Sequence, residues 1–159
     1  MSLVIRPGEP SDVGLIARLI RELAIYEKLE EDVSMTEEML AANLFGARRY
    51  AETLIAEHDG EPVGFALFFH NFSTFLGRPG IYLEDLFVMP EHRASGIGRA
   101  LLTELARLAV ERGCGRLEWA VLDWNRDAIG FYERLGAKPN AEWTVYRLTG
   151  EALAALGRE

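Results

Sequence analysis

The sequence has little cysteine, no long run of apolar residues and no surplus of basic side chains. The single cysteine among 159 residues, Cys114, excludes an intramolecular disulfide framework and fits a reducing compartment. Apolar stretches such as residues 63–69 are far shorter than a membrane span. The first residues lack the basic start and long apolar core of a signal peptide. We therefore expect a cytoplasmic protein with no membrane partner.

The formal net charge of −8 argues against nucleic acid as the main partner, because phosphate contacts require a basic face. A negative potential concentrates cations, which favours a cationic substrate, but an acidic balance also serves solubility alone. Charge by itself does not separate these two interpretations. The three histidines have no metal-ligand spacing, so we predict that the protein binds no metal.

The length suits one domain with a substantial core, and we expect residues 1–159 to form a single domain. Apolar periodicity and turn residues predict a mixed α/β fold whose first hairpins are antiparallel and whose later units use crossover helices. The predicted strands are residues 3–6, 50–57, 63–69, 81–88, 116–122 and 143–148. The predicted helices are residues 12–31, 36–45, 96–112, 126–135 and 151–156, each approximate at its ends. Residues 71–80 are predicted to be a loop between two strands.

One stretch, residues 81–102, combines a strand, a glycine-rich loop and the start of a helix. The loop, residues 93–98 (RASGIG), opens into an amphipathic helix, whose first N–H groups lack helical partners and whose dipole favours an anion. Arg93 and Arg99 are both able to meet phosphate. The motif differs from both the dinucleotide fingerprint and the nucleotide triphosphate loop. Its context therefore predicts a pyrophosphate-bearing ligand that is bound in another way.

A second unit follows downstream, where a turn ending at Asn125 leads into a helix that carries Tyr132. Taken alone, Asn125 is better explained as an N-cap and Tyr132 as a core aromatic residue. Their joint occurrence after the glycine-rich loop indicates a functional unit rather than two unrelated structural residues.

Together the two units resemble the GNAT superfamily of N-acetyltransferases, in which an R-x-x-G-x-G loop cradles the pyrophosphate of acetyl-CoA. The sequence is most similar to the spermidine/spermine acetyltransferase branch, and within it to the thialysine N-epsilon-acetyltransferases. Three segments carry this likeness, residues 21–29 (RELAIYEKL), 82–90 (YLEDLFVMP) and 120–126 (AVLDWNR). The resemblance implies the GNAT fold, with a mixed central sheet of about six to seven strands and helices on both faces. It also implies acetyl-CoA as cosubstrate and a homodimer.

The resemblance also implies roles for individual residues. Tyr132 would donate a proton to the departing thiolate, and Glu84 would lie at the reacting amine. The implied cofactor contacts are Leu86, Phe87 and Val88 for the acetyl and pantetheine groups, Arg93, Ala94, Ser95, Gly96, Ile97 and Gly98 for the pyrophosphate, and Asn125, Arg126, Asp127 and Ala128 for the pantetheine arm. The implied amine contacts are Tyr26, Glu27, Glu84, Trp119 and Glu142.

One segment departs from the pattern of the polyamine-specific members, which carry an Asp in the loop before the fourth strand. Here that loop reads FSTF at residues 72–75. The neutral loop and the turn at residues 122–125 are more similar to the thialysine branch. This departure argues against a long polyamine as the preferred substrate.

The proposed chemistry makes three demands on the residues. An amine with a lysine-like pKa of roughly 10.4 must lose a proton, and Glu84 either accepts it, directly or through water, or only binds the ammonium. A backbone N–H of residues 86–88 is the candidate donor to the oxyanion. The phenol of Tyr132, with an ordinary pKa near 10, can protonate a thiolate whose pKa is roughly 8.5. Because Cys114 lies outside these motifs, we predict direct transfer in a ternary complex.

The sequence therefore predicts an acetyl-CoA-dependent N-acetyltransferase acting on a primary amine of a small cationic molecule. Thialysine, a lysine-like amine, a diamine and a polyamine all fit this description. Two alternatives stay open: acetylation of a protein lysine or N-terminus, and a non-catalytic acetyl-CoA-binding module. A catalytic role for Glu84 and Tyr132 argues against the binding module, which needs neither residue.

Overall fold

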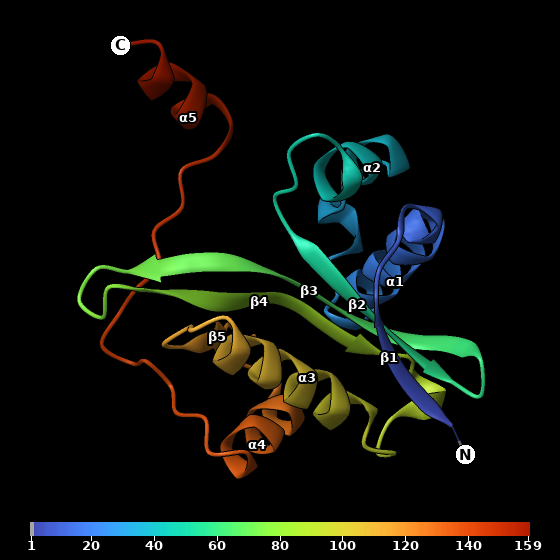
Figure 1. Ribbon diagram of the computed structural model, residues 1–159. Helices are drawn as coiled ribbons and strands as arrows, with labels where there is room; N and C mark the ends of the chain where they lie inside the picture. The colour runs from blue at the N-terminus through green and yellow to red at the C-terminus, as the bar shows by residue number, and fades with distance from the viewer. Residues whose placement is uncertain (1) are drawn as a thin grey trace. The chain divides into compact units, whose positions relative to one another are not determined.

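The computed structural model describes residues 2–159, which divide into two compact units on either side of the bond between Ala120 and Val121 (Figure 1). The first unit is built on a five-stranded sheet in the order β1-β2-β3-β4-β5. The first three strand pairs are antiparallel, and β4 pairs with β5 in parallel. The strands are β1 (Leu3–Pro7), β2 (Glu52–His58), β3 (Glu61–Ser73), β4 (Arg78–Val88) and β5 (Leu117–Trp119).

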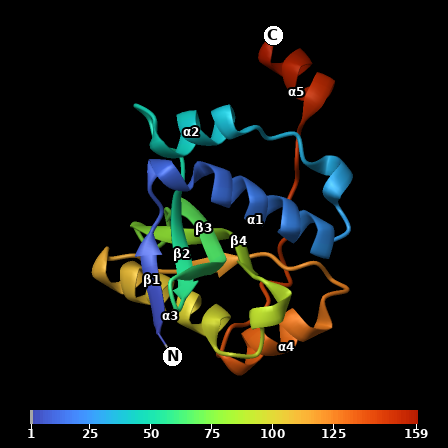
Figure 2. The same ribbon diagram turned by 90° about the vertical axis from the view of Figure 1, so that its right-hand side faces the viewer.

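Helices cover both faces of this sheet (Figure 2). On one face lie α1 (Val13–Tyr26) and α2 (Glu37–Phe45), and on the other lies α3 (Ile97–Glu111). The apolar side chains of α1 recur at helical spacing and pack against Ile55, Phe65 and Phe87 of the sheet. Because α3 connects β4 to β5 across the opposite face, those two strands run parallel. The mixed α/β class and the two helical layers confirm the sequence prediction.

The β2–β3 hairpin also agrees with its sequence. Asp59 and Gly60 have φ values of 51° and 81°, which is the pair of left-handed residues that a two-residue hairpin turn requires. Asp-Gly is a residue pair that favours this type of turn.

The predicted number of strands, six to seven, was wrong, because the sheet of the described residues has five. Residues 143–148 alternate in a way that predicts a strand, but no strand forms there. A strand requires a neighbour for its backbone hydrogen bonds, and the sheet ends at β5, which is only three residues long. The side chains of Trp143, Val145 and Tyr146 are consequently exposed.

Two boundaries also differ from the prediction. The first helix ends at Tyr26 rather than near residue 31, because Lys28 adopts a left-handed φ of 62° and Leu29 N–H donates to the Ala24 carbonyl. The predicted loop at residues 71–80 is mostly strand, since β3 continues to Ser73 and β4 begins at Arg78. Only four residues remain for the turn between them.

The second unit, described by itself, contains α4 (Arg126–Arg134) and α5 (Gly150–Gly157). Both helices lie close to their predicted positions. Within the described residues, no helix combines the length and the apolar character that crossing a membrane requires.

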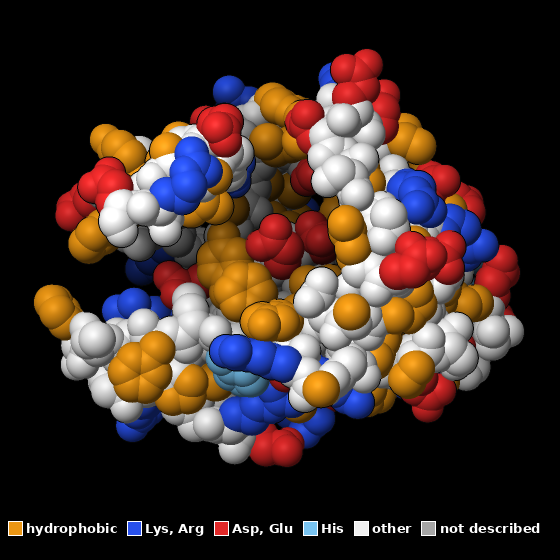
Figure 3. Space-filling view, turned by 90° about the horizontal axis from the view of Figure 1, so that it is seen from above, with side chains coloured by type: hydrophobic (Ala, Val, Ile, Leu, Met, Phe, Trp, Pro, Cys, Tyr) orange, Lys and Arg blue, Asp and Glu red, His pale blue; other side chains and the backbone are white. Residues whose placement is uncertain are grey.

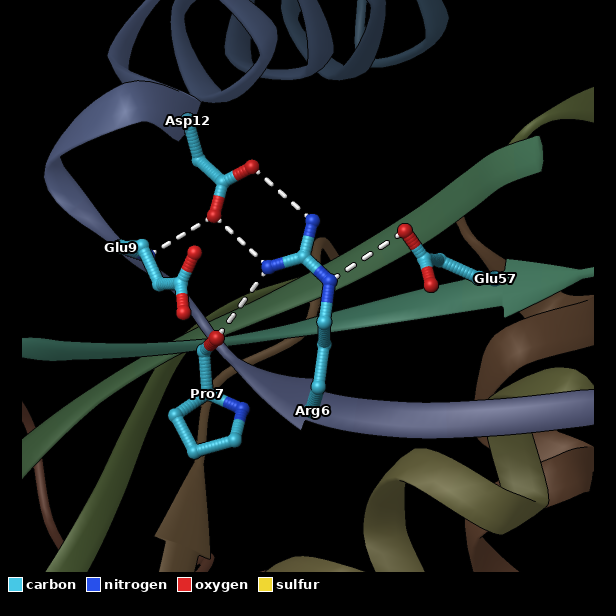
Figure 4. A network of polar contacts seen from close by, with 5 residues as sticks. All are labelled: Arg6, Pro7, Glu9, Asp12 and Glu57. Carbon is cyan, nitrogen blue, oxygen red and sulfur yellow. Dashed lines mark hydrogen bonds and ion pairs between the residues drawn. The ribbon is translucent and has the colours of Figure 1, made fainter. Parts of the chain in front are cut away.

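A polar network anchors the start of α1 to the edge of the sheet (Figure 4). The guanidinium of Arg6 on β1 donates two hydrogen bonds to the Asp12 carboxylate, at 2.7 and 2.9 Å, and its Nε lies 3.2 Å from a Glu57 oxygen. Asp12 also accepts the backbone N–H of Glu9 at 2.7 Å. The Arg6 hydrogen bonds lower the pKa of Asp12, although burial acts against them. The network fixes the direction in which α1 leaves β1.

Candidate active site

The β4 strand is irregular at Glu84, and this irregularity decides which side chains share a face of the sheet. Asp85 pairs with Leu67 and Leu83 pairs with Phe68, so Glu84 is the extra residue of a β-bulge. Tyr82 pairs with Phe69, which lies two residues from Leu67 on the same face of β3. Tyr82 and Asp85 therefore share one face, whereas in a regular strand they would lie on opposite faces.

That face carries three carboxylates, one from α1 and two from β4. Burial raises the pKa of Asp85 to about 7, and the charges of Glu84 and Glu27 add to the effect. Burial also raises the pKa of Glu27, with a further contribution from Glu84. Carboxylates held this close in a partly buried place form a site that a cation would stabilise. In the face seen in Figure 3, acidic side chains gather near the middle.

The end of α1 places Tyr26 and Glu27 at this cluster. Tyr26 is the last residue of the helix, and Glu27 is its C-cap. The left-handed conformation of Lys28 then turns the chain sharply away. Such a conformation costs a non-glycine residue about 1–2 kcal/mol, and its occurrence beside a carboxylate cluster is typical of a functional site. The helix thus ends where Glu27 meets Glu84.

Tyr82 extends the site along β4 toward β5. Burial raises its pKa, and the charges of Glu84 and Glu118 contribute. Glu118 lies opposite Tyr82 in the register and accepts a hydrogen bond from the Asn71 side chain at 3.1 Å. Trp119, the neighbouring residue on β5, is in register with the buried Leu83 and so belongs to the other face.

The glycine-rich loop joins β4 to α3. After the short 3₁₀ turn Pro90–His92, Ala94 and Gly96 both adopt left-handed φ values, 64° and 86°. Gly96 is the N-cap of α3, and a Cβ added there would meet no atom within 4 Å. The space beside Gly96 is therefore open, and the N–H groups of the first turn of α3, which lack helical partners, are candidates to bind an anion there. This donor set fits the pyrophosphate predicted from the sequence.

Arg93, the first residue of the loop, has its side chain turned toward β4 and α1. Its guanidinium carbon lies 4.5 Å from the ring centroid of Tyr26 and 5.2 Å from that of Phe87. Its Nε donates a hydrogen bond of 2.9 Å to the Val88 carbonyl. The loop and the end of α1 are thus joined by one side chain.

The second unit holds the other predicted residues. Asn125 is buried and caps α4, its side-chain oxygen accepting the N–H of Ala128 at 3.3 Å. Tyr132 lies on α4 with its ring 5.5 Å from that of Phe131. Glu142 is exposed in the segment that follows. The roles of these residues in binding and catalysis stay predictions.

The structure thus brings together Tyr26, Glu27, Glu84 and Arg93 within the first unit. Sequence reasoning missed Asp85 and Glu118. The adjacent acids at 84 and 85 were a visible signal, but only the bulge puts Asp85 on the same face as Glu27. Among the described residues, no group of three or more histidine, cysteine or acidic side chains is arranged to hold a metal ion.

Comparison with known proteins identifies the family. The model of the acetyltransferase (GNAT) family matches residues 17–137, which is most of the chain. This chain is a GNAT acetyltransferase. It is 43% identical over 165 residues to the thialysine N-epsilon-acetyltransferase of Bos taurus, covering 97% of this chain and 96% of the relative. It is 34% identical over 199 residues to the L-ornithine N5-acetyltransferase NATA1 of Arabidopsis thaliana, covering 97% and 87%.

The fold agrees with this assignment. A solved integron cassette protein of V. cholerae superposes with a TM-score of 0.83 at 29% identity, covering 100% of this chain and 99% of the other. The resemblance stated from the sequence is therefore confirmed, both for the GNAT superfamily and for its thialysine-acetylating relatives. As a GNAT enzyme the chain is an acetyltransferase for which acetyl-CoA is the family's acetyl donor.

Proposed function

We propose that this GNAT enzyme transfers an acetyl group from acetyl-CoA to a primary amine of a small cationic molecule, such as thialysine, a lysine-like amino acid, a diamine or a polyamine. The observation that carries the proposal is the group of carboxylates at the β4 bulge. Burial and the charge of Glu84 raise the pKa of both Glu27 and Asp85, and an ammonium group is the ligand that relieves this repulsion. The names of the relatives, which act on thialysine and on ornithine, support the same substrate class.

In this proposal, different residues bind acetyl-CoA, bind the amine and transfer protons. The backbone N–H groups at the start of α3 bind the pyrophosphate, and the β4 segment after the bulge presents backbone groups to the acetyl and pantetheine moieties. The carboxylate cluster binds the ammonium and takes one of its protons, which leaves the amine nitrogen free to attack the thioester carbonyl. The new N–C bond forms as the C–S bond breaks. Tyr132 gives its proton to the departing thiolate, the attacking nitrogen loses its second proton to solvent as the amide forms, and Tyr132 regains a proton from solvent.

The group that accepts the proton in this reaction works best when its pKa lies near neutrality. An ordinary carboxylate is too weak a base to take a proton from an ammonium efficiently, whereas a carboxyl with a pKa near neutrality is better matched. Glu84 is exposed and adjacent to Asp85, whose pKa is raised to about 7. We therefore assign proton acceptance to the Glu84–Asp85 pair as a unit, with Glu84 as the side chain that meets the amine.

We propose further that both units belong to one acetyltransferase domain, because the family match runs from residue 17 to residue 137 across the boundary between them. We also propose that the protein is cytoplasmic and a homodimer. Phe72 and Phe75 at the β3–β4 turn are exposed, which is compatible with a contact between copies. Sedimentation equilibrium tests the dimer, and a monomer at micromolar concentration would contradict it.

The test of the activity is coupled detection of CoA release over a panel of amines. The panel contains thialysine, lysine, ornithine, 1,4-diaminobutane, spermidine, a lysine-containing peptide and a peptide with a free N-terminus. The proposal expects turnover with at least one small amine and an acetylated product with a mass increase of one acetyl group. Turnover confined to the peptides would instead favour protein acetylation. Binding of acetyl-CoA with no turnover of any amine would favour the binding module.

A further inference from the structure

The contacts of Arg93 tie the cofactor loop to the amine side of the site. The residue begins the glycine-rich loop, yet its guanidinium lies over Tyr26 at the end of α1 and over Phe87 on β4. Its Nε donates a hydrogen bond of 2.9 Å to the Val88 carbonyl. A guanidinium stacked on aromatic rings and hydrogen-bonded through Nε is held in one orientation. One side chain thus connects three segments of the first unit.

These contacts conflict with the sequence expectation that the Arg93 side chain binds pyrophosphate. A side-on bidentate contact of phosphate with Nε and one Nη would break the hydrogen bond to Val88, and turning the guanidinium out toward the loop would break its stacking on Tyr26. The phosphate role has other candidates in the loop, namely the N–H groups of the first turn of α3 and the exposed Arg99. The structure therefore separates two arginines that look equivalent in the sequence.

We infer that Arg93 is a positioning residue that couples the cofactor loop to the amine-binding end of α1, and that its side chain is not a pyrophosphate ligand. Tyr26 immediately precedes Glu27, so a restraint on the Tyr26 ring also restrains the carboxylate that faces Glu84. Ordering of the loop by acetyl-CoA then orders the amine site through Arg93. By linkage, a bound amine strengthens acetyl-CoA binding by the same factor.

The contact itself is tested first, without any reference to activity. A double-mutant cycle of Arg93→Gln and Tyr26→Leu is measured by thermal unfolding of the protein without ligands. The inference expects the shift in the midpoint of the double variant to be smaller than the sum of the single shifts by about 2–4 °C. Additive shifts would show that Arg93 and Tyr26 do not interact, which would overturn the inference.

The functional consequence rests on the proposed function and is tested by comparing two arginines. Arg93→Gln should raise the KM for the amine about threefold to tenfold and change the Kd for acetyl-CoA by less than about twofold. The matched control, Arg99→Gln, should raise the Kd for acetyl-CoA and leave the amine KM unchanged. Arg93→Lys, which keeps the charge over the ring but loses the planar fork, should recover part of the amine KM.

The outcomes separate this inference from the proposed function. If Arg93→Gln weakens acetyl-CoA binding tenfold with an unchanged amine KM, Arg93 is a phosphate ligand and the inference is wrong. If no amine is turned over but the unfolding cycle is non-additive, the proposed function fails while the Arg93–Tyr26 contact stands. The linkage is measured directly by calorimetric titration of an amine into the protein with and without CoA. Amine binding should be tighter in the presence of CoA, and equal affinities would overturn the coupling.

Discussion

Replacing Asp85 with Asn should stabilise the protein at alkaline pH. In the folded protein burial and the charges of Glu84 and Glu27 raise the pKa of Asp85 from 3.8 to about 7. Because the folded-state pKa lies above the unfolded value, protonation of Asp85 favours the folded state. This contribution to stability is fully present below about pH 3.8 and is lost as the pH rises to about 7. Above that pH the ionised carboxylate destabilises the folded state by as much as about 4 kcal/mol. Asn carries no charge at any pH and avoids this cost.

The expected gain in stability of Asp85→Asn follows from the raised pKa of Asp85. The amide still has to satisfy its own hydrogen bonds in a partly buried place, so we expect Asp85→Asn to add about 1–3 kcal/mol to the free energy of unfolding at pH 8. The gain should shrink steadily between pH 7 and pH 4, because over that range the carboxyl is protonated in the folded wild-type protein and ionised in its unfolded chain. The same variant should lose activity, since the Glu84–Asp85 pair is proposed to accept the amine's proton.

The assay is urea unfolding followed by tryptophan fluorescence at several pH values between 4 and 8.5. The control is Asp32→Asn, which changes an exposed carboxylate in the short 3₁₀ turn after α1 and should have an effect near zero at every pH. A stability difference between Asp85→Asn and wild type that does not change with pH would refute the reasoning. A loss of stability at pH 8 would refute it more strongly.

Three further variants test other parts of the account. Tyr132→Phe should lower kcat by at least about tenfold, measured by stopped-flow, and leave the Kd for acetyl-CoA unchanged, measured by calorimetry. Full turnover by this variant would exclude Tyr132 as the acid. Gly96→Ala and Gly113→Ala, which strain φ values of 86° and 72°, should each cost about 1 kcal/mol of stability, but only Gly96→Ala should weaken acetyl-CoA binding. Arg6→Met removes the two hydrogen bonds that the Arg6 guanidinium donates to Asp12. It should lower the free energy of unfolding by about 2–3 kcal/mol in urea titrations at pH 7. A loss below about 0.5 kcal/mol would contradict the network's role.

Local signals in the sequence were sufficient for much of the fold. Asp59 and Gly60 specify their turn by themselves, and the apolar periodicity of α1 and α3 identifies both helices. The loop before α3 was predicted for the same reason, since glycine is needed at Gly96 for its left-handed φ. These features depend on neighbours within a few residues along the chain.

The remaining features depend on contacts between distant segments. The bulge at Glu84 is set by the register of β4 against β3, which no alternation in either strand reveals. The orientation of Arg93 depends on Tyr26, which lies 67 positions earlier in the chain and meets it only when α1 packs on the sheet. Residues 143–148 have the composition of a strand but no neighbouring strand to pair with, and composition alone cannot supply one.

The measurement that most directly tests the central claim is the affinity of the carboxylate cluster for a cationic amine. It is made by calorimetric titration of a turned-over amine into protein saturated with CoA, for wild type, Glu27→Gln and Glu84→Gln. The account predicts that each substitution weakens amine binding about tenfold or more and leaves CoA binding unchanged, because each removes one carboxylate from the cluster that binds the ammonium. Equal amine affinities in all three proteins would contradict it.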